Sequence, residues 1–239
     1  MLLPRPGDTL PITNRLLDRL PAHDRARVTS AGERVELVFR EVLAAHGGAM
    51  PYVYFPLGSF ISLVAPMGGK NNLEVALAGN EGFFGVDVAM GVAVSPVHAV
   101  VQGSGPALRI RSAAFRRELG RIPTLRTCID RYAYVLMSQL IQAAGCTRFH
   151  VVERRLARWL LMTSDRSHSA SFHITHEAIA YMLGVRRVGI TKAASALQER
   201  GIINYARGAI TILDRKQLEQ AACSCYRSDL STYARVFSK

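Results

Sequence analysis

Four glycines between residues 78 and 101 are spaced as if backbone amides approached a bound ligand closely. A glycine-rich turn that opens a short helix can present its N–H groups to a phosphate. An enclosed anion normally also needs a guanidinium or ammonium group as its counter-charge. The chain has no Lys or Arg from Gly79 to Gln102, so this stretch resembles a phosphate site that lacks the charge.

Thiols and imidazoles are the other groups in this sequence that could do chemistry. The chain has four cysteines and no Cys-x-x-Cys pair: Cys128, Cys146, Cys223 and Cys225. We interpret them as reduced thiols and expect no metal site and no cofactor, because a zinc site usually takes its four ligands in two pairs. The last three could sense oxidants if a basic neighbour such as Arg148 or Arg227 lowered a thiol pKa.

Enzyme chemistry is not indicated by any motif. His173 and His176 have the spacing of a ligand pair, but no carboxylate or thiol partner is evident near them. The sequence contains no Ser/His/Asp order, no phosphate-binding loop of the Walker type and no paired carboxylates. We therefore expect a protein that is not an enzyme.

The charge of the chain favours a polyanionic partner. The formal net charge is +12, and residues 149–239 contain 14 Lys and Arg against 7 Asp and Glu. Such a balance is typical of nucleic-acid-binding domains. No signal peptide or bilayer-length apolar run is evident, so we expect a cytoplasmic protein.

The hydrophobic pattern changes twice along the chain. Six short segments rich in valine and aromatic residues predict an antiparallel β-sandwich or roll: 35–39, 52–55, 60–65, 73–77, 98–101 and 107–110. After Pro123, apolar residues at three- and four-residue steps predict a helix of about six turns. This stripe is close to a heptad seam, which favours pairing with the same helix of a second subunit: Leu125, Ile129, Tyr132, Leu136, Leu140 and Ala143.

The last third of the chain predicts a compact helical module. Residues 149–162 form an amphipathic pattern that places Arg154, Arg155 and Arg158 on the exposed side, and residues 164–171 look like a polar loop. Thr175 can cap a helix that ends at Gly184. A second helix then runs to Arg200, which gives the helix-turn-helix pattern.

The second helix of this pattern has two distinct faces at 100 degrees per residue. The apolar face suits packing on the first helix: Ile190, Ala193, Ala194 and Leu197. The opposite face would meet a DNA groove: Arg187, Val188, Thr191, Lys192 and Ser195. Arg186 is better placed for phosphate. Residues 202–213 predict a β-hairpin, a wing whose tip residue Arg207 could reach a second phosphate.

Several blocks of the sequence together resemble the Crp/Fnr family of bacterial transcription regulators. They are YVYFPLGSFISLV, EVALAGNEGFFGVDVAMG, ERRLARWLLM, ITHEAIAYMLGVRRVGITKAASALQERGII and ACSCY. The resemblance implies an α+β fold in three parts: a cyclic-nucleotide-binding-like β-roll over 1–122, a dimerisation helix over 123–148, and a winged helix-turn-helix over 149–239. It also implies a homodimer on palindromic promoter DNA, with RNA polymerase as a further partner.

The resemblance also assigns roles to single residues. The family's base-reading positions fall on Arg187, Val188 and Lys192, where regulators of the cyclic-AMP type have glutamate in place of the valine. The positions around a bound cyclic nucleotide fall on residues that lack the required polar groups: Gly82, Gly85, Val86, Val97, His98, Leu140 and Ile141. We therefore expect a regulator that cyclic AMP does not control.

Other modes of control remain open at this point. They are a cyclic nucleotide bound in another way, oxidation of the thiols, or haem with His98 as axial ligand. A lone histidine on an apolar strand is more often a hydrogen-bonded core residue. An iron-sulfur cluster in the sensor region is not expected, because the first 127 residues contain no cysteine.

Overall fold

The computed structural model describes residues 13–69, 71–206 and 208–238. The chain divides into two compact units, one made of residues 10–66 and 75–137 and the other mainly of residues 138–239, with 67–74. The boundary between them falls inside a helix that we expected to stand as a separate segment. Among the described residues, no helix has both the length and the apolar character needed to cross a bilayer.

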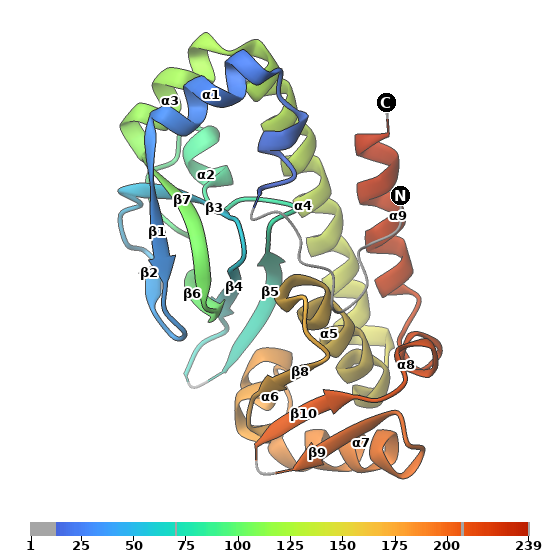
Figure 1. Cartoon of the computed structure of the whole chain (residues 1–239). Helices are drawn as coiled ribbons and strands as arrows, with labels where there is room; N and C mark the ends of the chain where they lie inside the picture. The colour runs from blue at the N-terminus through green and yellow to red at the C-terminus, as the bar shows by residue number, and fades with distance from the viewer. Residues whose placement is uncertain (1–12, 70, 207, 239) are drawn as a thin grey trace. The chain divides into compact units, whose positions relative to one another are not determined.

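Antiparallel strands build the first unit (Figure 1). One sheet has the order β1-β7-β3, with β1 (Gly32–Leu37), β7 (Gly105–Arg111) and β3 (Tyr52–Pro56). The other has the order β2-β6-β4-β5, with β2 (Val42–Ala44), β6 (His98–Gly103), β4 (Phe60–Pro66) and β5 (Asn72–Ala78). All six predicted segments overlap observed strands, which confirms the antiparallel β architecture.

Short helices and an aromatic cluster complete this unit. The helices are η1 (Leu17–Arg19), α1 (Ala22–Ser30), α2 (Val86–Ala89) and α3 (Ser112–Arg121). Phe55 lies 5.0 Å from Phe83 between ring centroids, and Phe83 lies 5.7 Å from Phe115. All three rings are fully buried. Burial of aromatic rings in such pairs supplies a large part of the stabilisation of a small core.

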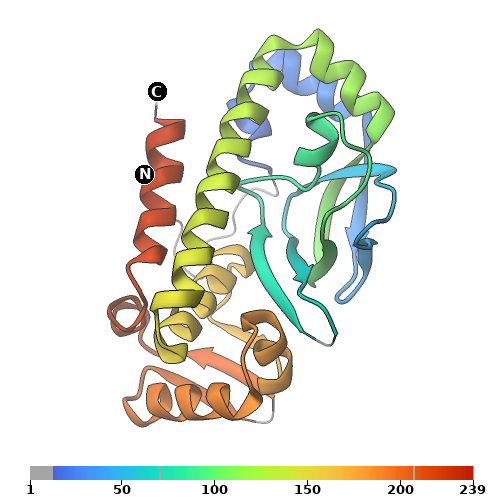
Figure 2. The same cartoon turned by 180° about the vertical axis from the view of Figure 1, so that it is seen from behind.

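Helix α4 (Pro123–Phe149) is unbroken over 27 residues (Figure 2). Proline suits its first position, where the missing N–H has no intrahelical partner to lose. The helix is longer than the six turns predicted, because it continues through Gly145. A glycine inside a helix costs only about 1 kcal/mol. The burial of the next residue, Cys146, offsets that cost.

The second unit packs helices around α5 (Val152–Ser167) and a small sheet. The helices are α6 (His176–Leu183), α7 (Arg187–Glu199), α8 (Arg215–Ala221) and α9 (Cys225–Phe237). The sheet has the order β8-β10-β9, with β8 (Ser171–His173), β10 (Ala209–Ile212) and β9 (Ile203–Ala206). Its core contains aliphatic side chains of α5, α6, α7, α8 and β10, together with Tyr226 of α9: Leu156, Leu160, Ile179, Ile190, Leu197, Ile210 and Leu218.

Two predictions for this unit are wrong. The segment 164–171 is not a polar loop, because α5 continues to Ser167 with Ser164 and Arg166 buried, and β8 follows. Arg155 and Arg158 are not exposed. Arg155 donates a hydrogen bond to the Leu183 carbonyl, and Arg158 forms a 2.7 Å ion pair with Asp229 of α9. Each guanidinium therefore has polar partners inside the fold.

Candidate nucleic-acid interface

Helices α6 and α7 are joined by a tight turn with the predicted capping residues. The Thr175 hydroxyl accepts a hydrogen bond of 3.1 Å from the amide of Ala178 at the start of α6. Gly184 ends the helix with φ 62°, and the amide of Val185 donates back to the carbonyl of Ala180. A left-handed residue at this point lets the chain turn within three residues. This is the helix-turn-helix arrangement predicted from the sequence.

The two faces of α7 differ in burial as the 100-degree pattern predicts. The inner face is at most 5% exposed: Ile190, Ala193, Ala194 and Leu197. Every side chain of the predicted DNA face is exposed: Arg186, Arg187, Val188, Thr191, Lys192 and Ser195. Val188 is 58% exposed and lies between the basic side chains of this face. The face therefore offers three cations around one apolar group.

Arg186 stands at the N-cap of α7, just before the first helical residue. Its own side chain makes no capping hydrogen bond. The amides of the first turn and the helix dipole make this end of the helix favourable for an anion. An exposed guanidinium beside a helix N-terminus suits a phosphate contact.

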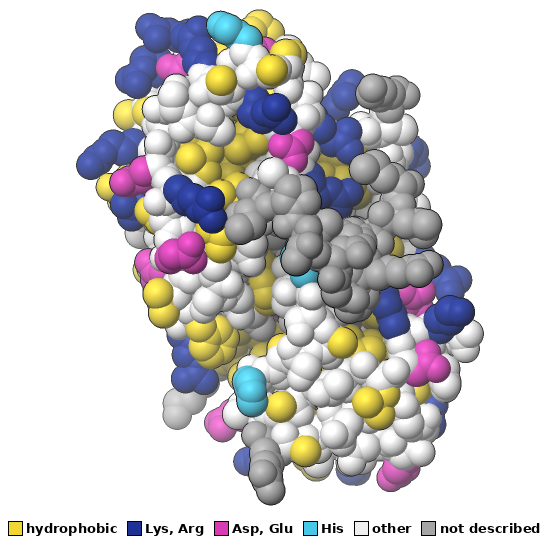
Figure 3. All heavy atoms as spheres, viewed as in Figure 1, with side chains coloured by type: hydrophobic (Ala, Val, Ile, Leu, Met, Phe, Trp, Pro, Cys, Tyr) yellow, Lys and Arg dark blue, Asp and Glu magenta, His cyan; other side chains and the backbone are white. Residues whose placement is uncertain are grey.

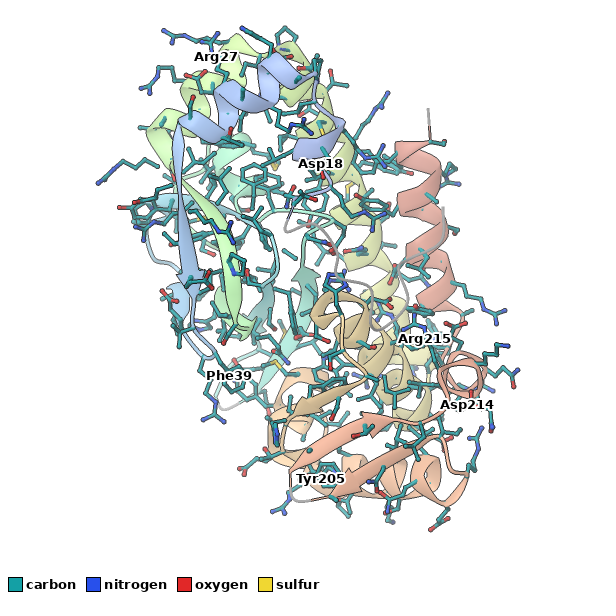
Figure 4. All side chains as sticks on the ribbon, in the orientation of Figure 1. Asp18, Arg27, Phe39, Tyr205, Asp214 and Arg215 are labelled. Carbon is teal, nitrogen blue, oxygen red and sulfur yellow. The ribbon has the colours of Figure 1, made fainter. Side chains whose placement is uncertain are left out.

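His176, which sequence analysis did not assign to the interface, ties α7 to the wing. Its ring stacks on Tyr205 of β9 with 4.1 Å between centroids, and its Nδ1 lies 3.1 Å from the Thr191 hydroxyl (Figure 4 labels Tyr205). That hydroxyl donates to the carbonyl of Arg187, so Nδ1 carries the proton and donates to the hydroxyl oxygen. The hydroxyl of Thr191 is thus occupied within the protein, and its methyl group is what the face presents.

Burial, followed by the nearby charge of Arg187, lowers the pKa of His176 below its ordinary value. Both effects disfavour the imidazolium form. The Nε2 atom is buried and has no hydrogen-bond partner among the described residues. A neutral ring with its proton on Nδ1 is therefore the form that burial and the charge of Arg187 favour.

The wing is a three-stranded antiparallel sheet, one strand more than the predicted hairpin. Ala206 pairs with Ala209 at its tip, and β8 joins the outer side of β10. The side chain of Gln198 on α7 accepts a 2.7 Å hydrogen bond from the amide of Tyr205, which fixes the wing against α7. Arg207, the predicted phosphate contact at the tip, lies outside the described residues.

Two glycines of the 78–101 stretch, Gly82 and Gly85, are packed against side chains of their own unit. A Cβ on Gly82 would overlap the hydroxyl end of Tyr132, and one on Gly85 would overlap Val53. Gly85 also has φ 134°, a conformation that L side chains rarely adopt. Val86 is buried at the start of α2. Close packing therefore explains Gly82 and Gly85 without any bound anion.

The two residues at the expected phosphate-binding positions are half-buried on and before β6. Val97 offers no polar side-chain atom, and His98 uses Nδ1 to accept a 3.2 Å hydrogen bond from the amide of His46. The His46 ring lies 6.2 Å away and contacts the carbonyl of Pro96. His98 therefore has the hydrogen-bonded role that is common for a histidine on an apolar strand.

The apolar stripe predicted for dimerisation is split along α4. Leu125, Ile129 and Tyr132 are at most 2% exposed in their own chain, so a second copy cannot contact them. Leu136 and Ala143 are half-buried, and Leu140 is 40% exposed. Four exposed apolar residues of α4 form a neighbouring stripe: Tyr134, Met137, Leu140 and Ile141. Dimerisation through α4 stays a prediction.

The basic side chains do not by themselves locate the interface. Figure 3 shows Lys and Arg gathered over the top of the view, where Figure 1 places α1 and α3, as well as on the other unit. Surface charge of one sign raises affinity for any polyanion and says little about register. The turn between α6 and α7 and the three-stranded wing define a winged helix-turn-helix fold, and the exposed face of α7 is its candidate DNA-binding surface.

Comparison with known proteins agrees with this class. Residues 154–221 match the model of the Crp-like helix-turn-helix domain. The structure is similar to FixK2 from Bradyrhizobium japonicum, with a TM-score of 0.67 and 13% identity over 80% of this chain and 98% of that chain. It is also similar to CLP, a c-di-GMP responsive global regulator from Xanthomonas campestris, with a TM-score of 0.67 and 14% identity over 81% and 100%.

A third similar structure is TTHB099, a CRP-family transcriptional regulator from Thermus thermophilus. Its TM-score is 0.65, with 17% identity over 79% of this chain and 96% of that chain. No curated protein sequence matches the chain. The chain therefore has the fold of Crp/Fnr transcription regulators and carries a Crp-like helix-turn-helix domain, as the sequence blocks predicted.

Proposed function

We propose that this protein is a sequence-specific DNA-binding transcription regulator and not an enzyme. The observation that carries the proposal is the exposed face of α7, where Arg187, Val188 and Lys192 project from a helix whose other face is buried. A helix held in this way by its inner face can enter the major groove as a rigid body. The similarity to Crp/Fnr regulators supports the same use of this helix.

Each exposed group of α7 has a matching chemical partner on DNA. The Arg187 guanidinium can donate two hydrogen bonds to the O6 and N7 of guanine, and Val188 can contact a thymine methyl. Lys192 lies about one helical turn further along the same face and can donate to a guanine or a phosphate. Arg186 binds the phosphate backbone at the helix N-terminus.

The regulator acts as a homodimer on a palindromic site. The support is the exposed apolar stripe of α4, in which Tyr134, Met137 and Ile141 are 47%, 52% and 67% exposed and follow each other at helical spacing. Two copies paired through such a stripe form an isologous interface, which matches a twofold-symmetric operator. The two half-sites would lie about 34 Å apart, one turn of DNA.

Cyclic AMP is not the effector of this regulator. The residues at the expected ribose and phosphate positions are Val86, Val97 and His98, and the nearby glycines are packed against Tyr132 and Val53. Each missing polar contact leaves a ligand group unpaired, at a cost of about 1–3 kcal/mol. Isothermal titration with cyclic AMP and cyclic GMP tests this point, and a micromolar dissociation constant for either would contradict it.

The DNA-binding proposal is tested by selecting sites from a random DNA library and measuring affinity by fluorescence anisotropy. Arg187→Ala should weaken binding to the selected site by about 1–3 kcal/mol and relax the preference at one base pair of each half-site. Arg235→Ala, an equal loss of charge on an exposed residue of α9, is the matched control. If the selected pool shows no consensus, or both variants behave alike, the proposed interface is wrong.

The dimer is tested separately by sedimentation velocity. Ile141→Asp should shift the chain towards the monomer, because it places a charge in the centre of an apolar interface. Met90→Asp is the control, since Met90 is equally exposed at 72% but lies at the end of α2. A wild-type chain that sediments as a monomer at micromolar concentration would refute pairing through α4.

A further inference from the structure

Three cysteines and one histidine, residue types that can bind a metal ion, lie together in the second unit. None of them belongs to α6 or α7. The ligand atoms of Cys146, His150, Cys223 and Cys225 all lie within 4.8 Å of one another. The sulfur atoms of Cys146 and Cys223 are 3.5 Å apart, and Sγ of Cys225 is 3.4 Å from Nδ1 of His150. Spacing in the sequence led us to expect no metal site.

Local structure explains how the four groups come together. Cys146 lies in the last turn of α4, and the amide of His150 donates to its carbonyl, so the two side chains lie one turn apart on one face. Cys223 and Cys225 flank Ser224, the N-cap of α9. Helix α9 begins beside the C-terminal end of α4 in both views (Figures 1 and 2), where Gln142 donates to Cys225.

We propose that Cys146, His150, Cys223 and Cys225 bind one Zn²⁺ ion in a tetrahedral Cys₃His site. Three thiolates and one imidazole are a common ligand set for structural zinc. With zinc–sulfur bonds of about 2.3 Å, the edges of a tetrahedron are about 3.8 Å long, close to the separations observed here. An iron-sulfur cluster is too large for this geometry, because several iron and sulfide ions would have to stand between the cysteines.

The groups around the four ligands suit a cluster of thiolates. Gln142 Nε2 donates a 3.1 Å hydrogen bond to Sγ of Cys225, and the Ser228 hydroxyl holds the Gln142 carbonyl oxygen at 3.5 Å. An amide that is oriented towards a sulfur in this way is a typical outer partner of a metal ligand. The hydrogen bond from this amide is strongest when the sulfur is negatively charged.

The charge balance of the surroundings also favours the bound ion. Three thiolates and Zn²⁺ carry a net charge of −1. Arg155 is 9% exposed, its guanidinium donates to the neutral carbonyl of Leu183, and it makes no ion pair with a carboxylate among the described residues. Burial disfavours an uncompensated cation at Arg155, and Cys146 and Cys223 are close enough to interact with its charge. The zinc–thiolate group supplies the anion that this buried cation otherwise lacks.

Zinc binding replaces the thiol protons, which pass to the solvent, and it joins the end of α4 to the start of α9. Because the ligands come from both ends of the module, the ion stabilises the folded module against the unfolded chain. Unlike the proposed DNA-binding function, the metal site can be tested on the protein alone. Its failure and the failure of that function are therefore distinguishable.

The first test is elemental analysis of the untagged full-length chain, expressed in minimal medium supplied with zinc. We expect one zinc per chain after gel filtration. Cys223→Ser should lose the metal, while Cys128→Ser, the same change at a buried cysteine outside the cluster, should keep it. A wild-type chain without zinc, or a Cys223→Ser variant with the full amount, would overturn the proposal.

The second test begins with the wild-type chain alone, so its main result does not depend on a variant that folds. The metal is removed from the wild-type chain under reducing conditions, and Co²⁺ is added in its place. We expect the absorption of tetrahedral cobalt with thiolate-to-cobalt charge transfer, saturating at one equivalent. Gln142→Leu keeps all four ligands and should weaken zinc binding about 10- to 100-fold through loss of the outer hydrogen bond. An octahedral cobalt spectrum, or a Cys146–Cys223 disulfide in place of bound metal by mass spectrometry, would refute the site.

Discussion

The close approach of Gly82 to Tyr132 predicts that core packing, and not a bound ligand, requires glycine at position 82. A Cβ on Gly82 would come closer than 3.0 Å to three atoms at the hydroxyl end of the Tyr132 ring. Both residues are buried, and the ring also packs on Phe83 with 5.5 Å between centroids. Gly82→Ala therefore overpacks the core, which typically costs about 1–3 kcal/mol.

The cost should depend on Tyr132. In a Tyr132→Ala background the space beside residue 82 is open, so the added methyl group should cost nearly nothing. The difference between the two backgrounds is a coupling energy of about 1–3 kcal/mol, as expected for residues in direct contact. Gly120→Ala in α3 is the control, because no atom lies within 4 Å of its added Cβ. That substitution should stabilise the helix by about 0.5–1 kcal/mol.

Hydrogen exchange of the slow amides of β3 and β7 is the appropriate assay. The only tryptophan, Trp159, lies in the other unit and would report on the wrong transition. A loss of 1–3 kcal/mol corresponds to about 5- to 150-fold faster exchange of amides that open only by global unfolding of the unit. If Gly82→Ala is equally costly with and without the Tyr132 ring, packing is not the reason for this glycine.

Three further predictions concern the DNA-binding unit. Asp229→Asn should destabilise it by about 3–5 kcal/mol, measured through Trp159 fluorescence in urea, because it leaves the Arg158 cation buried and unpaired. Val188→Glu should move the selected base preference towards cytosine, whose N4 amino group a carboxylate can accept from; an unchanged consensus would contradict base contact at this position. His176 has a lowered pKa, so below its ordinary value of 6.5 the unfolded chain binds a proton that the native ring excludes. The unit should therefore lose stability as the pH falls through that value, and His176→Gln should lose this part of the pH dependence.

The helix-turn-helix could be predicted from the sequence because its signals are local. The cap at Thr175, the left-handed glycine at 184 and the two faces of α7 all follow from residues within one or two helical turns. The short strands of the other unit were also predictable, since their apolar runs are bounded by turn-forming residues. In each case the backbone geometry depends mainly on neighbours in the sequence.

Side-chain environments that depend on distant segments could not be predicted. Periodicity placed Arg155 and Arg158 on the polar side of α5, but it could not reveal that Asp229 of α9 would cover that side 71 residues later. The same holds for α4, where a single stripe was expected to face a partner. Part of that stripe instead packs in the core of its own unit, as the contact between Tyr132 and Phe83 illustrates.

The cysteine cluster also depends on segments that are distant in the sequence, and this dependence has a consequence for metal binding. Each half of the site is visible in the sequence, as a Cys and His at i and i+4 and as a Cys-x-Cys, but neither half can complete a tetrahedral site alone. Cys146 and Cys223 are 77 residues apart and His150 and Cys225 are 75 apart, and the helix-turn-helix lies between the two halves. In the unfolded chain, bringing the two halves together would cost loop-closure entropy. In the folded module the two halves already lie side by side, so the ion does not bear this cost. Tight zinc binding by this chain would therefore require a folded module, and loss of the ion on denaturation would follow the unfolding of α5 to α9.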